Sequence, residues 1–205
     1  MKIFVIGFNK TGTSSLHGLF CYLDIKSIHW DKIKPVIDII DEFDAFTDIT
    51  PYSFKEYYNK YPDSLFILNT RPISNWLISR YKHAIIHNFE ECWCWPISEE
   101  RTNEWIIERE ILYPDILDFF IDKPKQLLIL NIEKKGWEMC VLTFIQKHII
   151  LEKNHHENQR ELEDQDKVKL IKENVFKCLS KRGYNGDELL PKNIDIGLYN
   201  YTTFL

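Results

Sequence analysis

Apolar residues gather in four short segments along this chain, of which residues 3–6 form a continuous run, and more polar segments separate them. The four apolar segments are residues 3–6, 45–49, 64–69 and 126–132. Their β-branched, leucine and aromatic side chains are typical of strands that are buried on both faces of a parallel sheet. Between and after these four segments, apolar positions recur with helical spacing. This predicts helices at residues 13–22, 53–60, 72–85, 101–121 and 136–150, the fourth with an interruption at Pro114.

The last quarter of the chain has a different pattern. Residues 152–166 are almost wholly polar and are predicted to form a mobile surface segment. Residues 167–181 are amphipathic and predict a helix that Gly183 ends. Strands that alternate with helices predict an α/β fold, in which helices flank a mainly parallel central sheet in three layers. Without repeats or a low-complexity linker, residues 1–205 are expected to form a single domain.

Composition narrows the range of functions. The net charge is -5, whereas a protein that binds nucleic acid generally has a basic surface. The five cysteines form no disulfide or zinc pattern, which favours reduced thiols and a cytoplasmic location. No apolar stretch is long enough to span a membrane. We therefore expect a cytoplasmic protein without a nucleic-acid partner or a membrane span, whose oligomeric state the sequence leaves open.

The turn after the first apolar run carries the strongest chemical signal. Residues 7–14 read GFNKTGTS and keep both glycines of the phosphate-binding pattern G-x-x-x-x-G-K-[ST]. Lys10 stands before the second glycine, however, and a threonine fills the usual lysine position. Because the turn follows a strand and opens a helix, its backbone amides are expected to bind an anion. No obvious magnesium-binding carboxylate ends a later strand, as it would in an NTPase.

This turn resembles the K-x-G-T-[ST] loop of the sulfotransferases that use 3′-phosphoadenosine 5′-phosphosulfate (PAPS), a family with a P-loop-type fold. The residues that carry the resemblance are Lys10, Thr11, Gly12, Thr13, Ser14 and Ser15. The resemblance implies that they bind PAPS as the sulfuryl donor and that no metal ion is needed. It also implies a catalytic role for Lys10 at the bridging oxygen, where negative charge grows as the bond breaks.

A second motif extends the resemblance. In the family, an arginine just after a strand and a serine eight residues later bind the 3′-phosphate, and Arg71 and Ser79 match this pattern. Residues 43–49, 128–132 and 136–140 are similar to stretches of one branch of small sulfotransferases. The likeness therefore covers residues 1 to about 150, and it weakens over residues 151–205. One late stretch, residues 181–187, is similar to a basic loop that folds over the 3′-phosphate.

In that late stretch the resemblance implies cofactor contacts from Lys181, Arg182 and Gly183. The order of the two basic residues is reversed relative to the family, and basic residues in a last helical turn also simply complement the helix dipole. Both interpretations stay open. The cluster CWCWP at residues 92–96 likewise either lines the acceptor pocket or forms aromatic core or a surface flap.

The acceptor's proton needs a base. Cytosolic relatives place a histidine at the end of the second strand of the family order, and Asp48 takes that position here. We predict Asp48 as the catalytic base, with His29 and His17 as alternatives. The acceptor itself is a small molecule, a glycan or a lipid, and the sequence does not select among them.

Two other functions share these features, a P-loop kinase or NTPase and a non-catalytic nucleotide-binding module. The displaced Lys10 and the pair Arg71 and Ser79 favour the sulfotransferase over the first. Retention of Lys10 and of the loop glycines favours it over the second.

Overall fold

The computed structural model of this chain describes residues 1–29, 36–86, 97–145 and 181. These residues divide into two compact units. Unit 1 contains residues 1–71 and 112–145 of the described chain, and unit 2 contains residues 72–111 and 181. Each unit is described below by itself.

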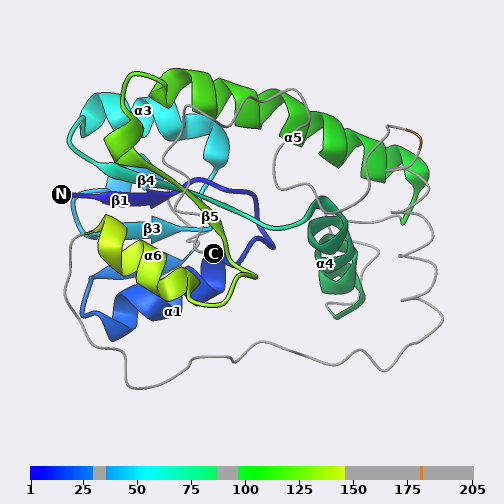
Figure 1. The fold of residues 1–205 in the computed structure, drawn as a ribbon, viewed down its shortest axis with the longest axis horizontal. Helices are drawn as coiled ribbons and strands as arrows, with labels where there is room; N and C mark the ends of the chain where they lie inside the picture. Colours follow the sequence, from blue (N-terminus) through cyan, green and yellow to red (C-terminus); the bar gives the residue numbers. More distant parts are fainter. Residues whose placement is uncertain (30–35, 87–96, 146–180, 182–205) are drawn as a thin grey trace. The chain divides into compact units, whose positions relative to one another are not determined.

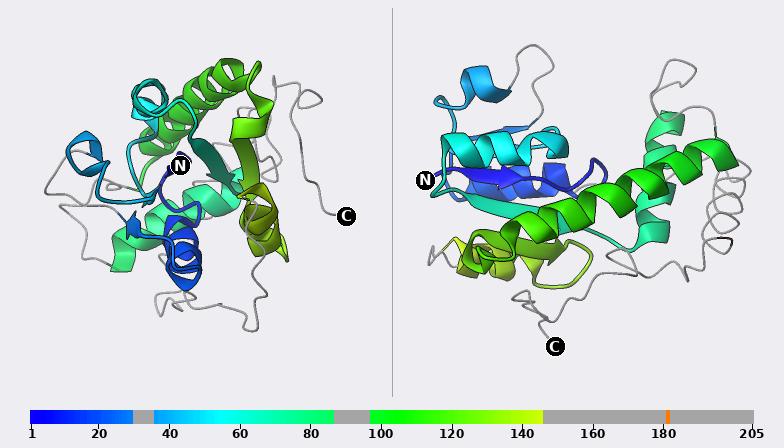
Figure 2. Two further views of the ribbon diagram at one scale, coloured as in Figure 1. Left: turned by 90° about the vertical axis from the view of Figure 1, so that its left-hand side faces the viewer. Right: turned by 90° about the horizontal axis from the view of Figure 1, so that it is seen from above.

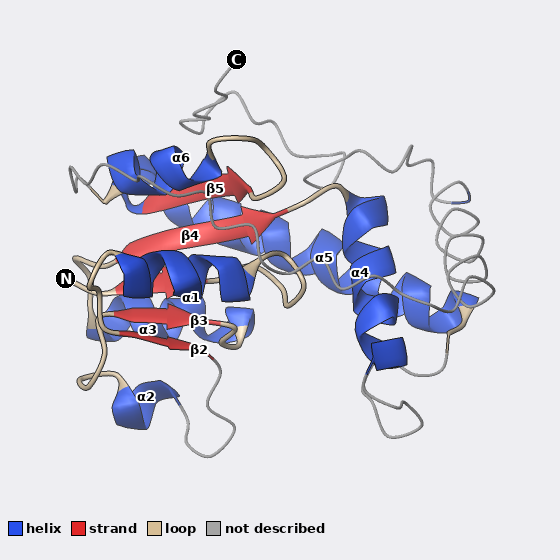
Figure 3. Ribbon diagram, turned by 90° about the horizontal axis from the view of Figure 1, so that it is seen from below, coloured by secondary structure: helices blue, strands red, loops and turns tan. Residues whose placement is uncertain are grey.

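Unit 1 is built on a five-stranded sheet in which all neighbouring strands are parallel (Figures 1 and 3). Its strands are β1 (Ile3–Val5), β2 (Ser27–His29), β3 (Ala45–Thr47), β4 (Leu65–Thr70) and β5 (Leu127–Asn131). Their order across the sheet is β2-β3-β1-β4-β5. The strand that leads into the glycine-containing turn is therefore central, and the carboxyl ends of all five strands lie at one edge.

Helices cover both faces of the sheet (Figure 2). One face carries α1 (Thr13–Tyr22) and α6 (Trp137–Phe144), and the other carries α3 (Phe54–Lys60) and the second part of α5 (Glu99–Phe120). Shorter elements complete the unit: α2 (Val36–Ile39), η1 (Pro51–Ser53) and η2 (Pro124–Gln126). This is the predicted three-layer α/β fold, and it is confirmed.

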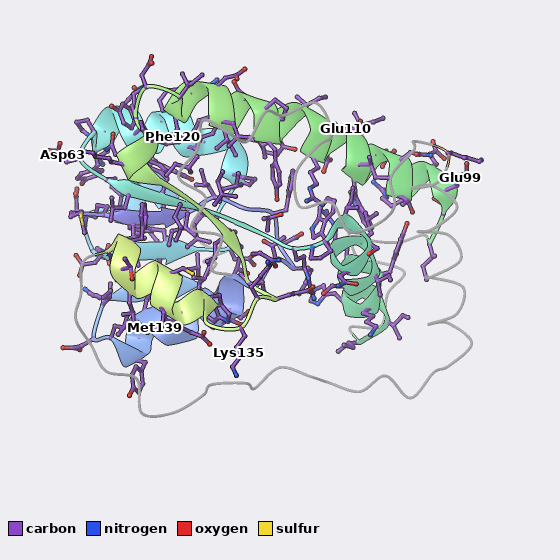
Figure 4. The ribbon with its side chains drawn as sticks, viewed as in Figure 1. Asp63, Glu99, Glu110, Phe120, Lys135 and Met139 are labelled. Carbon is purple, nitrogen blue, oxygen red and sulfur yellow. The ribbon has the colours of Figure 1, made fainter. Side chains whose placement is uncertain are left out.

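Aromatic residues fill the core between the sheet and α3. The Phe4 ring on β1 stacks on Phe46 of β3 at 5.1 Å, on Tyr57 of α3 at 4.9 Å and on Phe66 of β4 at 5.3 Å between ring centroids. The ring of Phe120 on α5, which Figure 4 labels, lies 4.9 Å from that of Phe66 between centroids. These rings fix the three central strands against one another, so the strand ends that carry the candidate site have a rigid support.

Unit 2 contains α4 (Ile73–Ile86) and the first part of α5. Its core combines tryptophan with buried arginine: the Arg80 guanidinium lies 4.2 Å from the centre of the Trp105 ring and 5.0 Å from that of Trp76. Arg109 stacks 5.3 Å from Trp76 as well. Such cation–π contacts keep α4 and this part of α5 together.

All four predicted strands are confirmed, and β2 and α2 were not predicted. The expected interruption at Pro114 is wrong, because α5 continues through this residue. Leu112 and Tyr113 before it and Ile116 and Leu117 after it are buried, and their packing outweighs one missing backbone hydrogen bond. Residues 152–166, and all but Lys181 of the helix predicted for 167–181, lie outside the described residues. Within the described part of the chain, no helix is both long and apolar enough to cross a bilayer.

Candidate active site

The loop between β1 and α1 turns sharply because two of its residues have a left-handed backbone. The φ angle is 64° at Lys10 and 88° at Gly12. A Cβ atom at Gly12 would meet the Ile132 side chain, which would have to shift, and the positive φ strains any residue with a side chain there. The turn brings the loop onto the first turn of α1, whose N–H groups have no acceptor within a helix and favour an anion.

Asn69 of β4 holds both ends of this loop. Its Oδ1 accepts a hydrogen bond from the N–H of Gly7 at 2.8 Å. Its Nδ2 donates to the carbonyl oxygen of Thr11 at 3.1 Å and to Thr11 Oγ1 at 2.6 Å. The Thr11 hydroxyl donates in turn to the Phe8 carbonyl. Asn69 was not predicted as a site residue, and the only signal in the sequence is one amide within an apolar run.

Arg71, directly after β4, joins this loop to the loop after β5. Its Nε donates to Oε1 of Glu133 at 2.7 Å, and its Nη2 contacts the same oxygen. Its Nη1 donates to the carbonyl oxygen of Lys10 at 3.1 Å. The predicted nucleotide-binding arginine therefore forms an ion pair and also supports the peptide of the predicted catalytic lysine.

His29, at the end of β2, lies between two hydroxyl groups. Its Nδ1 is 2.9 Å from Thr47 Oγ1, and its Nε2 is 3.2 Å from Oγ of Ser14 in the first turn of α1. The Thr47 hydroxyl donates to the Ile28 carbonyl at 3.2 Å, so it accepts from Nδ1–H. In the tautomer that this pattern allows, the neutral ring carries its proton on Nδ1 and presents the Nε2 lone pair to Ser14.

Asp48 follows β3 and also has a left-handed backbone, with φ of 59°. Its Oδ1 accepts a hydrogen bond from the Thr13 hydroxyl at 3.2 Å. Thr13 begins α1, so this bond connects the predicted base to the helix terminus where an anion is expected. Asp48, Lys10 and His29 thus belong to one cluster at the carboxyl edge of the sheet.

Burial and charge act together on the histidines of this cluster. Burial lowers the pKa of His29 from its ordinary value; Asp48 raises it, and His17 and Lys10 lower it further. Burial also lowers the pKa of His17, whose ring stacks on His29 at 5.6 Å between centroids. His17 Nδ1 lies 2.9 Å from Ser27 Oγ. Both rings therefore favour the neutral form, which can accept a proton.

The remaining predicted residues have varied surroundings. Ser15 is exposed on α1, next to Ser14 in sequence. Ser79 lies on α4 of unit 2, and Lys181 forms an ion pair with Glu99 in the same unit. Arg182, Gly183 and the cluster at residues 92–96 lie outside the described residues. No group of three or more potential metal ligands occurs among the residues that the structure describes.

The chain resembles a known family over part of its length. Residues 33–115 match the family model described as "Sulfotransferase domain". The matched segment is less than half of the chain; it contains Asp48, Arg71 and Ser79, and it begins after the Lys10 loop. The match supports a sulfotransferase family and sulfuryl transfer in general, and the parallel sheet with helices on both faces is consistent with that fold. A comparison with curated proteins finds no match.

Proposed function

We propose, starting from the sulfotransferase-domain match, that this protein transfers a sulfuryl group from PAPS to a hydroxyl or amine of a small molecule, a glycan or a lipid. The observation that carries the proposal is the loop between β1 and α1, in which Lys10 stands next to the start of a helix and Arg71 supports its peptide. PAPS is strongly anionic, and this edge of the sheet offers backbone N–H groups and two cations.

Several groups of the loop are suited to holding PAPS, which supplies the sulfuryl group. The backbone N–H groups of residues 11–15 would bind its phosphosulfate. The hydroxyls of Thr11, Thr13 and Ser14 already bond to Phe8, Asp48 and His29, so these three residues would contribute through their backbone.

Lys10 would stabilise the departing phosphate. As the bond between sulfur and the bridging oxygen breaks, negative charge grows on that oxygen, and an ammonium group beside it lowers the barrier. The carboxylate of Asp48 would take the proton of the acceptor as its oxygen or nitrogen bonds to sulfur. The products are the sulfated acceptor, adenosine 3′,5′-bisphosphate and a proton held by Asp48.

Arg71 would bind the 3′-phosphate, because its planar guanidinium suits a phosphomonoester. For Ser79, Lys181, Arg182 and Gly183 the same role rests on the sequence motifs alone. A 3′-phosphate preference separates this proposal from a kinase, which would bind ATP with magnesium.

The direct test is sulfuryl transfer by the full chain with Lys10→Ala. We expect a loss of about 10²–10³ in the transfer rate, the usual effect of removing one electrostatic stabiliser. Lys125→Ala is the matched control, since Lys125 is exposed beside the amino end of β5, away from the carboxyl edge. Normal turnover in a folded Lys10→Ala variant would remove Lys10 from the mechanism.

A further inference from the structure

The ion pair between Arg71 and Glu133 occupies the part of the guanidinium that is best suited to a phosphate. Nε and Nη2 form the edge that binds two oxygens of a phosphate or carboxylate side by side. In this protein both nitrogens contact one carboxylate oxygen, Oε1 of Glu133. Another contact of Arg71, from Nη1 to the Lys10 carbonyl, uses a different edge.

We infer that Glu133 is an internal competitor for Arg71: its carboxylate takes the place of the nucleotide's 3′-phosphate and returns when that phosphate leaves. This inference rests on the proposed function. It assigns a role to Glu133 that the motifs do not contain, and it explains why a residue suited to phosphate binding is paired with an acid of the same chain.

The surroundings of the pair allow the exchange. The side chains of Arg71 and Glu133 are 22% and 27% exposed, so the carboxylate can turn into water. Meanwhile the backbone beside it is fixed, because the N–H of Glu133 donates to Asn131 Oδ1 at 3.0 Å and that of Ile132 to the Thr70 carbonyl at 3.2 Å. Only the side chain of Glu133 has to move.

The charges favour the exchange in both directions. A phosphomonoester is a dianion with three oxygens, so it attracts the Arg71 guanidinium more strongly than a single carboxylate oxygen does. A partly exposed ion pair is weak, so its loss opposes nucleotide binding only slightly. Its return, however, competes with the bisphosphate product, and product release often limits the turnover of transferases and other enzymes. Since the Nη1 contact uses another edge, Arg71 can support Lys10 in both states.

The test is calorimetry and dissociation kinetics on the full chain with adenosine 3′,5′-bisphosphate and with AMP. For Glu133→Gln we expect bisphosphate to bind roughly two- to fivefold more tightly, the range that a partly exposed ion pair allows. The gain should come mainly from slower dissociation, and AMP affinity should stay unchanged. In an Arg71→Ala background, Glu133→Gln should have no effect.

Glu138→Gln is the matched control for the loss of one negative charge. Glu138 lies on α6, whereas Glu133 and the exposed Lys135 belong to the loop before it (Figure 4). Weaker or unchanged bisphosphate binding by Glu133→Gln overturns the inference. Tighter binding also overturns it if AMP affinity rises equally, if Glu138→Gln has the same effect, or if the effect remains in the Arg71→Ala background. If the wild-type chain binds no bisphosphate at all, the proposed function fails too; normal binding without a Glu133 effect overturns only the role of Glu133.

Discussion

At the scale of single residues, two groups compete for the role of proton acceptor. Asp48 is a carboxylate that receives one hydrogen bond from Thr13. His29 presents an Nε2 lone pair to Ser14 and has a lowered pKa, so its ring is neutral near pH 7. We propose Asp48 because it stands at the end of β3, next to the strand that leads into the Lys10 loop, whereas His29 ends the outer strand β2.

Asp48→Asn tests this assignment. The amide keeps the size of the side chain and can still accept from Thr13, but it is not basic. We expect unchanged nucleotide binding and a loss of about 10²–10⁴ in the single-turnover rate. His29→Gln is the comparison variant. Full activity of Asp48→Asn together with a slow His29→Gln would assign the base to His29.

The lowered pKa of His29 also predicts how stability depends on pH. The unfolded chain has an ordinary histidine pKa of about 6.5 and takes up a proton before the folded chain does. The free energy of unfolding should therefore fall as the pH drops from about 7 to 5.5, and His29→Gln should make this fall shallower. Urea denaturation across that range measures it, with His17→Gln/His29→Gln expected to be shallower still. A slope equal to that of the wild type would contradict the expectation.

The positions of three candidate residues were predictable because a local sequence pattern carries each of them. Lys10, Asp48 and Arg71 follow strands that the apolar runs reveal, and each lies at the carboxyl edge of the sheet. Asn69 and Glu133 were not predictable in this way. Their partners, Gly7 and Arg71, are 62 residues away in sequence, and only the alignment of β1, β4 and β5 brings them together.

At the scale of elements, two glycines have opposite roles in α1, one before the helix and one inside it. Gly12 precedes the helix with a left-handed backbone and lies against Ile132, whereas a Cβ atom at Gly18, inside the helix, would meet open space. One glycine is therefore required by the loop, and the other only weakens the helix.

These two glycines form a matched pair of variants. Gly12→Ala should destabilise the protein by more than about 1 kcal/mol and reduce bisphosphate binding, because the left-handed backbone strains a residue with a Cβ and the Ile132 side chain must shift to admit it. Gly18→Ala should stabilise it by about 0.5–1 kcal/mol and leave binding unchanged. Thermal denaturation and calorimetry measure both effects. A tolerated Gly12→Ala would show that the loop can take another conformation.

The elements that the sequence pattern missed have a common cause. β2 is a strand of three residues, Ser27–His29, at the edge of the sheet, and all three are only half-buried. Such a strand has no continuous apolar run and cannot be recognised by one. α2 has only four residues, which is too short for helical spacing to appear. The other four strands, β1, β3, β4 and β5, could be predicted from the sequence because both of their faces are buried.

At the scale of the whole molecule, the proposed site residues divide between the two units. Lys10, Asp48 and Arg71 belong to unit 1, and Ser79 and Lys181 belong to unit 2. A measurement of ligand binding to the full chain reports on both units together. It also tests the rival functions, because a kinase and a sulfotransferase select different nucleotides.

Thermal stability with bound nucleotide therefore separates these functions. At a hundred times its dissociation constant, adenosine 3′,5′-bisphosphate should raise the free energy of unfolding by about 2.7 kcal/mol. ATP with magnesium should have a smaller effect at the same concentration. Stabilisation by ATP that depends on magnesium, without an effect of the bisphosphate, would favour the kinase.

The left-handed backbone at Lys10 and Asp48 has a consequence for laboratory evolution. Among the described residues other than glycine, only Lys10, Asp24 and Asp48 have a positive φ, and a residue with a side chain in that conformation costs roughly 1–2 kcal/mol. A population of variants screened for heat resistance alone would be drawn toward glycine at all three positions. By the roles proposed for Lys10 and Asp48, glycine at position 10 or 48 would survive the screen as a more robust lineage that has lost sulfuryl transfer, whereas the proposed function gives Asp24 no such role. Screens of this protein therefore need to select for turnover and heat resistance together.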